Sequence, residues 1–199
     1  MAGVQIKDAT GVGYSAKVDN FNRLRTFATS TSQEHHGTGL GVNFMFSTPT
    51  RLTMANGDTG TLLYVQNNNP AALLVITKIA LSSSVAGVTY SLLKNQIVGT
   101  LSNNTSVTPQ NLNFQSGVTA QATTQIWNGV GTTGIGGLTG GGVLQIHPLE
   151  ASSPHIIDIN GGIDLGSGNI LGLRMTNNTG GNAVVSLSIR AFFESTSAN

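Results

Sequence analysis

The stretch Leu173–Phe193, LRMTNNTGGNAVVSLSIRAFF, carries the pattern on which the prediction of the fold rests. Its second half alternates between apolar and polar residues. The apolar set is Val185, Leu187, Ile189 and Ala191, and the polar set is Ser186, Ser188 and Arg190. Because successive side chains of a strand point to opposite faces, the alternation predicts a half-buried antiparallel strand. The Asn- and Gly-rich run before it predicts a turn.

The same spacing occurs a second time in the chain. Leu63, Val65 and Asn67-Asn68 are followed by Val75 and Ile79, as Leu173, Met175 and Asn177-Asn178 are followed by Val185 and Ile189. The two sets are offset by 110 positions, the distance from Leu63 to Leu173. Two interpretations are open. The two segments are corresponding hairpins in the two halves of a sandwich, or they share no more than any two hairpins of similar length.

Short strand patterns recur along the whole chain. We expect strands at Val4–Lys7, Ala16–Val18, Leu24–Thr29, Val42–Phe46, Thr61–Gln66, Leu73–Leu81, Val88–Leu93, Ile97–Leu101, Asn111–Phe114, Val143–His147, Ile156–Ile159, Ile170–Thr176 and Ala183–Phe193. Asn-Gly, Gly-Gly and Asn-Pro steps between them favour turns. Helical periodicity is absent apart from a weak candidate at Thr31–His36. We therefore predict an all-β, antiparallel, jelly-roll-like β-sandwich at 41–199, preceded by an extended N-terminal arm at 1–40.

The segment Gly129–Gly142, GVGTTGIGGLTGGG, holds eight glycines and no charge. Glycine disfavours the interior of a regular helix or strand. The composition predicts a long flexible loop, or a loop ordered by a neighbouring subunit.

The overall composition excludes several classes of function. Charged residues make up 9% of the 199-residue chain, whereas an average soluble domain has about 25%. A net charge of +1 predicts neither nucleic-acid binding nor attachment to a membrane. The absence of cysteine excludes disulfides and thiolate metal sites. The N-terminus lacks an apolar signal core, so we expect synthesis in a cytoplasm without export through a standard secretion signal.

Charge is also unevenly distributed. From Thr59 to Leu149 the sequence contains two charged residues, Lys78 and Lys94. Weak repulsion between copies favours association. We expect the surface of this middle region to consist of uncharged polar residues, or to be buried against another chain.

The ionisable residues form no convincing catalytic site. Glu34-His35-His36 is the densest cluster, but neighbouring strand residues point to opposite faces, which disfavours a shared metal ion. His147 and His155, with Glu150 and Asp158, form a second cluster within a proline-bounded loop. No strained turn presents a nucleophile beside it. We favour a pH-sensitive contact between subunits over hydrolysis at this loop.

The segment Asp158–Asp164 contains Asn160-Gly161-Gly162 between apolar residues. It lacks the closing Glu of a calcium loop, so we interpret it as a hairpin turn. We accordingly predict no enzymatic activity, no cofactor and no metal.

Trp127 is the sole tryptophan and precedes the Gly-rich segment. Three interpretations are open: ordinary core, an anchor at a subunit interface, or a platform on which a sugar stacks.

The N-terminal residues resemble those of a known group of proteins. VQIKDATGVGYSAKVDNFNRLRTFATSTSQEHH, beginning at Val4, is similar to the arm that precedes a β-sandwich in some tailed-bacteriophage virion proteins. The matching positions are Val4, Ile6, Lys7, Asp8, Gly11, Gly13, Ala16, Val18, Asp19, Asn22, Arg23 and Leu24. Leu62–Leu81 and Gly168–Glu194 resemble the strand–Asn turn–strand element and the closing hairpin of the same group.

This resemblance implies a structural protein of the virion, similar to jelly-roll head decoration or cement proteins. Such proteins sit as trimers on the capsid surface, where they contact the major capsid protein. By this resemblance we expect the uncharged middle region to pack around the threefold axis of a homotrimer. It implies no catalytic residues. We expect contacts with the shell or between subunits to involve Lys7, Asp8, Lys17, Asp19, Arg23, Arg25 and Trp127. The alternatives are a tail, fibre or head-spike component, or a carbohydrate-binding sandwich module.

Overall fold

The computed structural model describes residues 5–7, 13–15, 17–18, 24–25 and 42–195. The chain divides into two compact units, Met1–Ser32 and Gln33–Asn199. Every regular element in the described residues is a strand, which confirms the predicted all-β class. No helix among these residues has the length and apolarity needed to cross a membrane.

The first unit contains two short antiparallel pairs. β1 (Gln5–Lys7) pairs with β2 (Gly13–Ser15), and β3 (Lys17–Val18) pairs with β4 (Leu24–Arg25). The predicted strands Val4–Lys7, Ala16–Val18 and Leu24–Thr29 are confirmed in their described residues, while β2 was not predicted. The predicted boundary at residue 40, the helix candidate Thr31–His36 and the Glu34-His35-His36 cluster lie outside the described residues.

The second unit, which we call the body, is built on eight strands that pair in a nested order. In chain order they are β5 (Asn43–Ser47), β7 (Thr59–Asn67), β8 (Ala72–Ser83), β9 (Val88–Lys94), β15 (Gly142–Pro148), β16 (His155–Leu165), β17 (Ile170–Asn177) and β18 (Ala183–Ser195). The first pairs with the last, the second with the seventh, the third with the sixth and the fourth with the fifth, always antiparallel. This nesting is the topology of a jelly roll.

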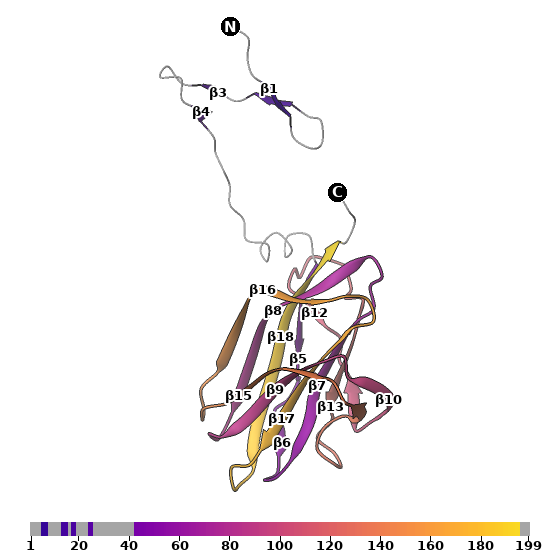
Figure 1. The fold of residues 1–199 in the computed structure, drawn as a ribbon, viewed down its shortest axis with the longest axis vertical. Coiled ribbons are helices and arrows are strands. Elements are labelled where there is room, and N and C mark those ends of the chain that lie inside the picture. The colour runs from indigo at the N-terminus through magenta and orange to yellow at the C-terminus, as the bar shows by residue number, and fades with distance from the viewer. Residues whose placement is uncertain (1–4, 8–12, 16, 19–23, 26–41, 196–199) are drawn as a thin grey trace. The chain divides into compact units, whose positions relative to one another are not determined.

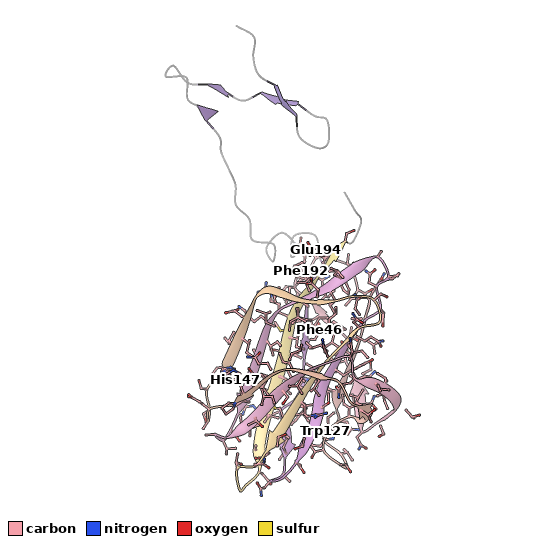
Figure 2. All side chains as sticks on the ribbon, in the orientation of Figure 1. Phe46, Trp127, His147, Phe192 and Glu194 are labelled. Atoms are coloured by element: carbon pink, nitrogen blue, oxygen red, sulfur yellow. The ribbon has the colours of Figure 1, made fainter. Side chains whose placement is uncertain are left out.

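The eight strands are divided between two sheets that face each other (Figure 1). One sheet has the order β12-β5-β18-β8-β16, with β6 (Leu52–Met54) beside β18, and the other has the order β11-β13-β7-β17-β9-β15. Alternate residues of the strands fill the space between the sheets. Phe46 in the middle of the body and Ile189 on β18 are examples, with 0% and 1% of their surfaces exposed (Figure 2). The jelly-roll prediction is therefore confirmed.

Two buried asparagines fix the turns that join the sheets. Asn67, at the end of β7, donates through Nδ2 to the carbonyls of Ala72 and Leu165 at 2.9 and 2.7 Å, and accepts the Asn69 amide at 2.8 Å. The first residue of β8 and the last residue of β16 are therefore held by one fully buried side-chain amide.

Asn177, at the end of β17, plays the same part in the β17–β18 turn. Its Nδ2 donates to the carbonyls of Met54, Ala55 and Gly181 at 2.9–3.0 Å. Its Oδ1 accepts from the hydroxyl of Thr179 at 2.7 Å. Both asparagines are 0% exposed, so each satisfies backbone groups that water does not reach.

A long insertion separates the fourth and fifth strands of the jelly roll. It contains β10 (Ile97–Ser102), β11 (Asn104–Ser106), β12 (Gln110–Asn111), β13 (Ala122–Trp127) and β14 (Gly136–Thr139). β13 extends one sheet beyond β7, and β12 extends the other beyond β5. Only Asn111 of the predicted strand Asn111–Phe114 lies in a strand, and Phe114 is 95% exposed in a turn.

The prediction of a flexible loop at Gly129–Gly142 is wrong for its second half, which forms β14 and pairs with β10. A Cβ on Gly134 would lie 2.6 Å from the Cα of Gly60, so the glycines allow backbone to pack on backbone. The amide of Ile135 donates to the carbonyl of Thr61 at 2.8 Å, and the Thr133 hydroxyl donates to the Asp58 carboxylate. These contacts tie the glycine segment to β7.

The interpretation of Asp158–Asp164 as a hairpin turn is also wrong. The segment lies within the single strand β16, where Asp158 pairs with Lys78 and Ile163 pairs with Ile76. The Asn-Gly-Gly step lies in a β-bulge there, because residues 159–162 of β16 separate these two pairs while only Thr77 of β8 does. Gly162 has a φ of +77°, which explains the glycine.

Candidate interaction surfaces

Trp127 ends β13 and is 2% exposed within a single chain. Its indole Nε1 donates to the carbonyl of Val130 at 3.3 Å, so its polar edge is satisfied inside the insertion. This position fits the core interpretation of the residue. A surface that meets a partner or a sugar must therefore be sought elsewhere on the body.

Some of the predicted contact residues of the arm lie among the described residues. Lys7 lies in β1, and Lys17 of β3 lies directly opposite Arg25 of β4. Asp8, Asp19 and Arg23 lie outside the described residues. The pairing of Lys17 with Arg25 brings two cationic residues to one register position of the first unit.

β15 presents an apolar surface at the edge of its sheet. It has one neighbouring strand, β9, and carries Val143, Leu144 and Ile146 with exposures of 54%, 43% and 61%. Leu144 is the extra residue of a bulge, because Val143 pairs with Leu93 while Gln145 pairs with Leu92. An exposed apolar edge strand is a ready surface for association with another chain. We call these three residues the β15 apolar edge.

His147 follows Ile146 on β15 and therefore points to the opposite face of the strand. His147 pairs with Tyr90 of β9, and its ring stacks on the Tyr90 ring with the centroids 6.1 Å apart. His155 of β16 lies 5.8 Å from Tyr90 and 6.4 Å from His147 between ring centroids. The edge strands of the two sheets thus bring both imidazoles together over one tyrosine. Figure 2 shows His147 at the left of the body, away from Trp127.

The two histidines line a pocket of about 300 Å³ at this rim of the sandwich. The other lining residues are Pro148, Leu149, Glu150, Ser153 and Pro154. We call this the histidine pocket. The predicted cluster is therefore confirmed for His147, His155 and Glu150. Asp158 does not line the pocket; its carboxylate forms an ion pair with the Lys78 Nζ at 3.0 Å.

Tyr90, whose ring contacts both histidines of the pocket, is buried. Its side chain is 0% exposed, and its hydroxyl has no hydrogen-bond partner among the described residues. Burial raises the pKa of Tyr90 above its ordinary value, because the charged phenolate loses its hydration. Tyr90 is therefore an uncharged group with an unused donor.

A larger trough of about 580 Å³ lies over β5, β18 and β8. Its lining is rich in hydroxyl groups, and the Oγ atoms of Ser82 and Ser186 lie 2.7 Å apart. Sequence reasoning did not single out this surface. The sequence pattern that could have predicted this surface is the alternation of Ser186 and Ser188 on β18, because both side chains point away from the core.

No group of three or more His, Asp or Glu side chains in the described part of the chain is placed to hold a metal ion.

The sequence matches no family model and no curated protein. Among solved structures, the chain is similar to one titled "Structure of infectious bursal disease virus Gx strain". The identity is 12% and the TM-score 0.33; the match covers 79% of this chain and 30% of that one. The chain thus spans less than a third of the length of that neighbour. The topology defines the class of the present protein, a jelly-roll β-sandwich.

Proposed function

We propose that the protein is a structural component of a virion, without enzymatic activity, cofactor or metal. In this proposal it is a head decoration or cement protein that acts as a homotrimer. It is made in the host cytoplasm and binds the major capsid protein on the surface of a phage head, without contacting nucleic acid or membrane. Jelly rolls are common among viral capsid proteins. The resemblance of the N-terminal residues to the arms of tailed-phage virion proteins supports the same role.

The β15 apolar edge carries this proposal. Its three exposed apolar side chains lie within four consecutive residues of a strand at the end of its sheet, with Gln145 between Leu144 and Ile146. Burial of an exposed Ile or Val side chain contributes about 1.5–3 kcal/mol. Contact between copies along this edge removes all three side chains from water.

The test is the solution mass of the full chain by light scattering, before and after brief heating. We expect three times 20.5 kDa. Ile146→Asp should dissociate the trimer, because it places a carboxylate within the apolar contact. Ile156→Asp is the matched control: Ile156 is 56% exposed on β16, at the edge of the other sheet. A monomeric wild type, or a trimer that survives Ile146→Asp, would contradict the proposed interface.

Attachment to the head is tested separately through the arm. Removal of residues 1–28 should leave the body folded, because the strands of the jelly roll all lie beyond Asn43. We expect the truncated protein to lose cosedimentation with phage heads. Undiminished cosedimentation would contradict the role proposed for the arm.

A further inference from the structure

We propose that the histidine pocket binds a single neutral sugar residue. The pocket is about 300 Å³, at the lower end of the range for small-molecule sites. That volume suits one ring rather than an extended oligosaccharide. It is formed by the β15–β16 connection and by the adjoining ends of these two edge strands.

The pocket has several polar groups without a partner. The side chains of His147, Glu150, Ser153 and His155 make no hydrogen bonds within the described residues. Tyr90 does not line the pocket, but its ring contacts both imidazoles. Elsewhere in the body, asparagines such as Asn67 and Asn177 use their polar atoms fully. Unused polar groups that converge on a cavity are typical of a ligand site.

The chemistry of the lining selects the ligand class. The imidazole faces, Pro148 and Pro154 provide apolar walls for the C–H face of a pyranose. The Glu150 carboxylate and the Ser153 hydroxyl are placed to hydrogen-bond its hydroxyl groups. The lining contains the Glu150 carboxylate and no Lys or Arg, which disfavours phosphate, sulfate or an acidic sugar.

The site does not depend on the proposed trimer. Ile146 and His147 are neighbours on β15 and point to opposite faces of the strand. The β15 apolar edge and the histidine pocket therefore face different directions. Loss of trimerisation in Ile146→Asp and loss of sugar binding are separate measurements.

The experiment is an NMR titration of the full chain at pH 7.5, observed at the C2–H signals of its four histidines. The probes are the methyl glycosides of glucose, galactose, mannose and N-acetylglucosamine, each added to about 50 mM because single sugars bind weakly, with Kd near 1 mM. For at least one glycoside we expect saturable shifts at His147 and His155 and none at His35 and His36. Inorganic phosphate should cause no shift at His147 or His155.

Two variants distinguish the pocket from a general surface effect. Glu150→Gln should weaken binding about tenfold, because a hydrogen bond to a charged group is replaced by a weaker one. Asp158→Asn is the matched control, since Asp158 is 66% exposed and lies outside the pocket. The proposal is overturned if no glycoside shifts His147 and His155, if phosphate alone shifts them, or if both variants weaken binding equally.

Discussion

Leu63 lies directly opposite Leu173 in the pairing of β7 with β17. In the other sheet, Ile79 lies directly opposite Ile189 in the pairing of β8 with β18. Both pairs join residues that are 110 positions apart in the sequence. An antiparallel pair has a local twofold axis between its directly opposed residues. The repeated spacing therefore marks two corresponding hairpins, related by an approximate twofold axis through the sandwich. This confirms the first interpretation of the repeat, that the two segments are corresponding hairpins in the two halves of the sandwich.

The buried asparagines at the ends of these hairpins should dominate the stability of the body. We expect Asn67→Ala and Asn177→Ala each to lower the free energy of unfolding by about 2–4 kcal/mol, since each leaves several buried backbone groups unsatisfied. Urea denaturation measures the effect. Asn68→Ala is the control: the exposed side chain of Asn68 makes one hydrogen bond, to the Thr123 hydroxyl, and its loss should cost under about 1 kcal/mol. Equal losses at Asn67 and Asn68 would contradict this account.

Sequence reasoning succeeded where one face of a strand is buried. The alternation of β18 follows directly from its position between β5 and β8, with the core on one side. It failed where glycine serves a purpose other than a turn. Asn160-Gly161-Gly162 has the composition of a hairpin turn but lies in a bulge, because the pairing with β8 resumes after it. A single strand's pattern contains no information on its partner's register.

The surfaces were predictable to a lesser degree. His147, Glu150 and His155 come together because a short connection joins β15 to β16, and their nearness in the sequence was enough to find them. The contribution of Tyr90 depends on its register opposite His147, which no local pattern predicts. Trp127 lies in the core because the insertion folds onto β7. The exposure of β15 depends on its place at the edge of the sheet order.

The close approach of Gly134 to Gly60 gives a test of the glycine segment. Gly134 and Gly140 have positive φ values of 95° and 63°, but a Cβ on Gly140 would meet no atom within 4 Å. Both substitutions by alanine incur the strain of this backbone region, about 1–2 kcal/mol. We expect Gly134→Ala to cost at least about 2 kcal/mol more, because its Cβ collides with backbone. Unfolding followed by Trp127 fluorescence measures both; equal costs would contradict ordered packing of this segment.

Tyr90 and Tyr64 provide a matched pair for the value of a buried hydroxyl. The Tyr64 hydroxyl donates to the Gln66 Oε1 at 2.7 Å, whereas the Tyr90 hydroxyl has no partner in the described residues. We expect Tyr64→Phe to lower the free energy of unfolding by about 1 kcal/mol and Tyr90→Phe to raise it by a similar amount. The denaturant midpoints of the wild type and both variants at pH 7 measure these changes in stability. Destabilisation by Tyr90→Phe would show that its hydroxyl is satisfied, for example by a bound water molecule.

The same tyrosines predict how stability depends on alkaline pH. Burial raises the pKa of both Tyr64 and Tyr90 above the ordinary value of 10.0. The unfolded chain therefore releases these protons at a lower pH than the folded chain does. Their contribution to stability is complete below pH 10.0 and is lost as the pH rises through the folded values. We expect the urea midpoint of the wild type to fall as the pH rises above about 10, and the fall to be shallower in Tyr90→Phe, which has one proton fewer to release. The same slope in both proteins would show that Tyr90 titrates alike in the folded and unfolded chains, and that its burial does not oppose ionisation.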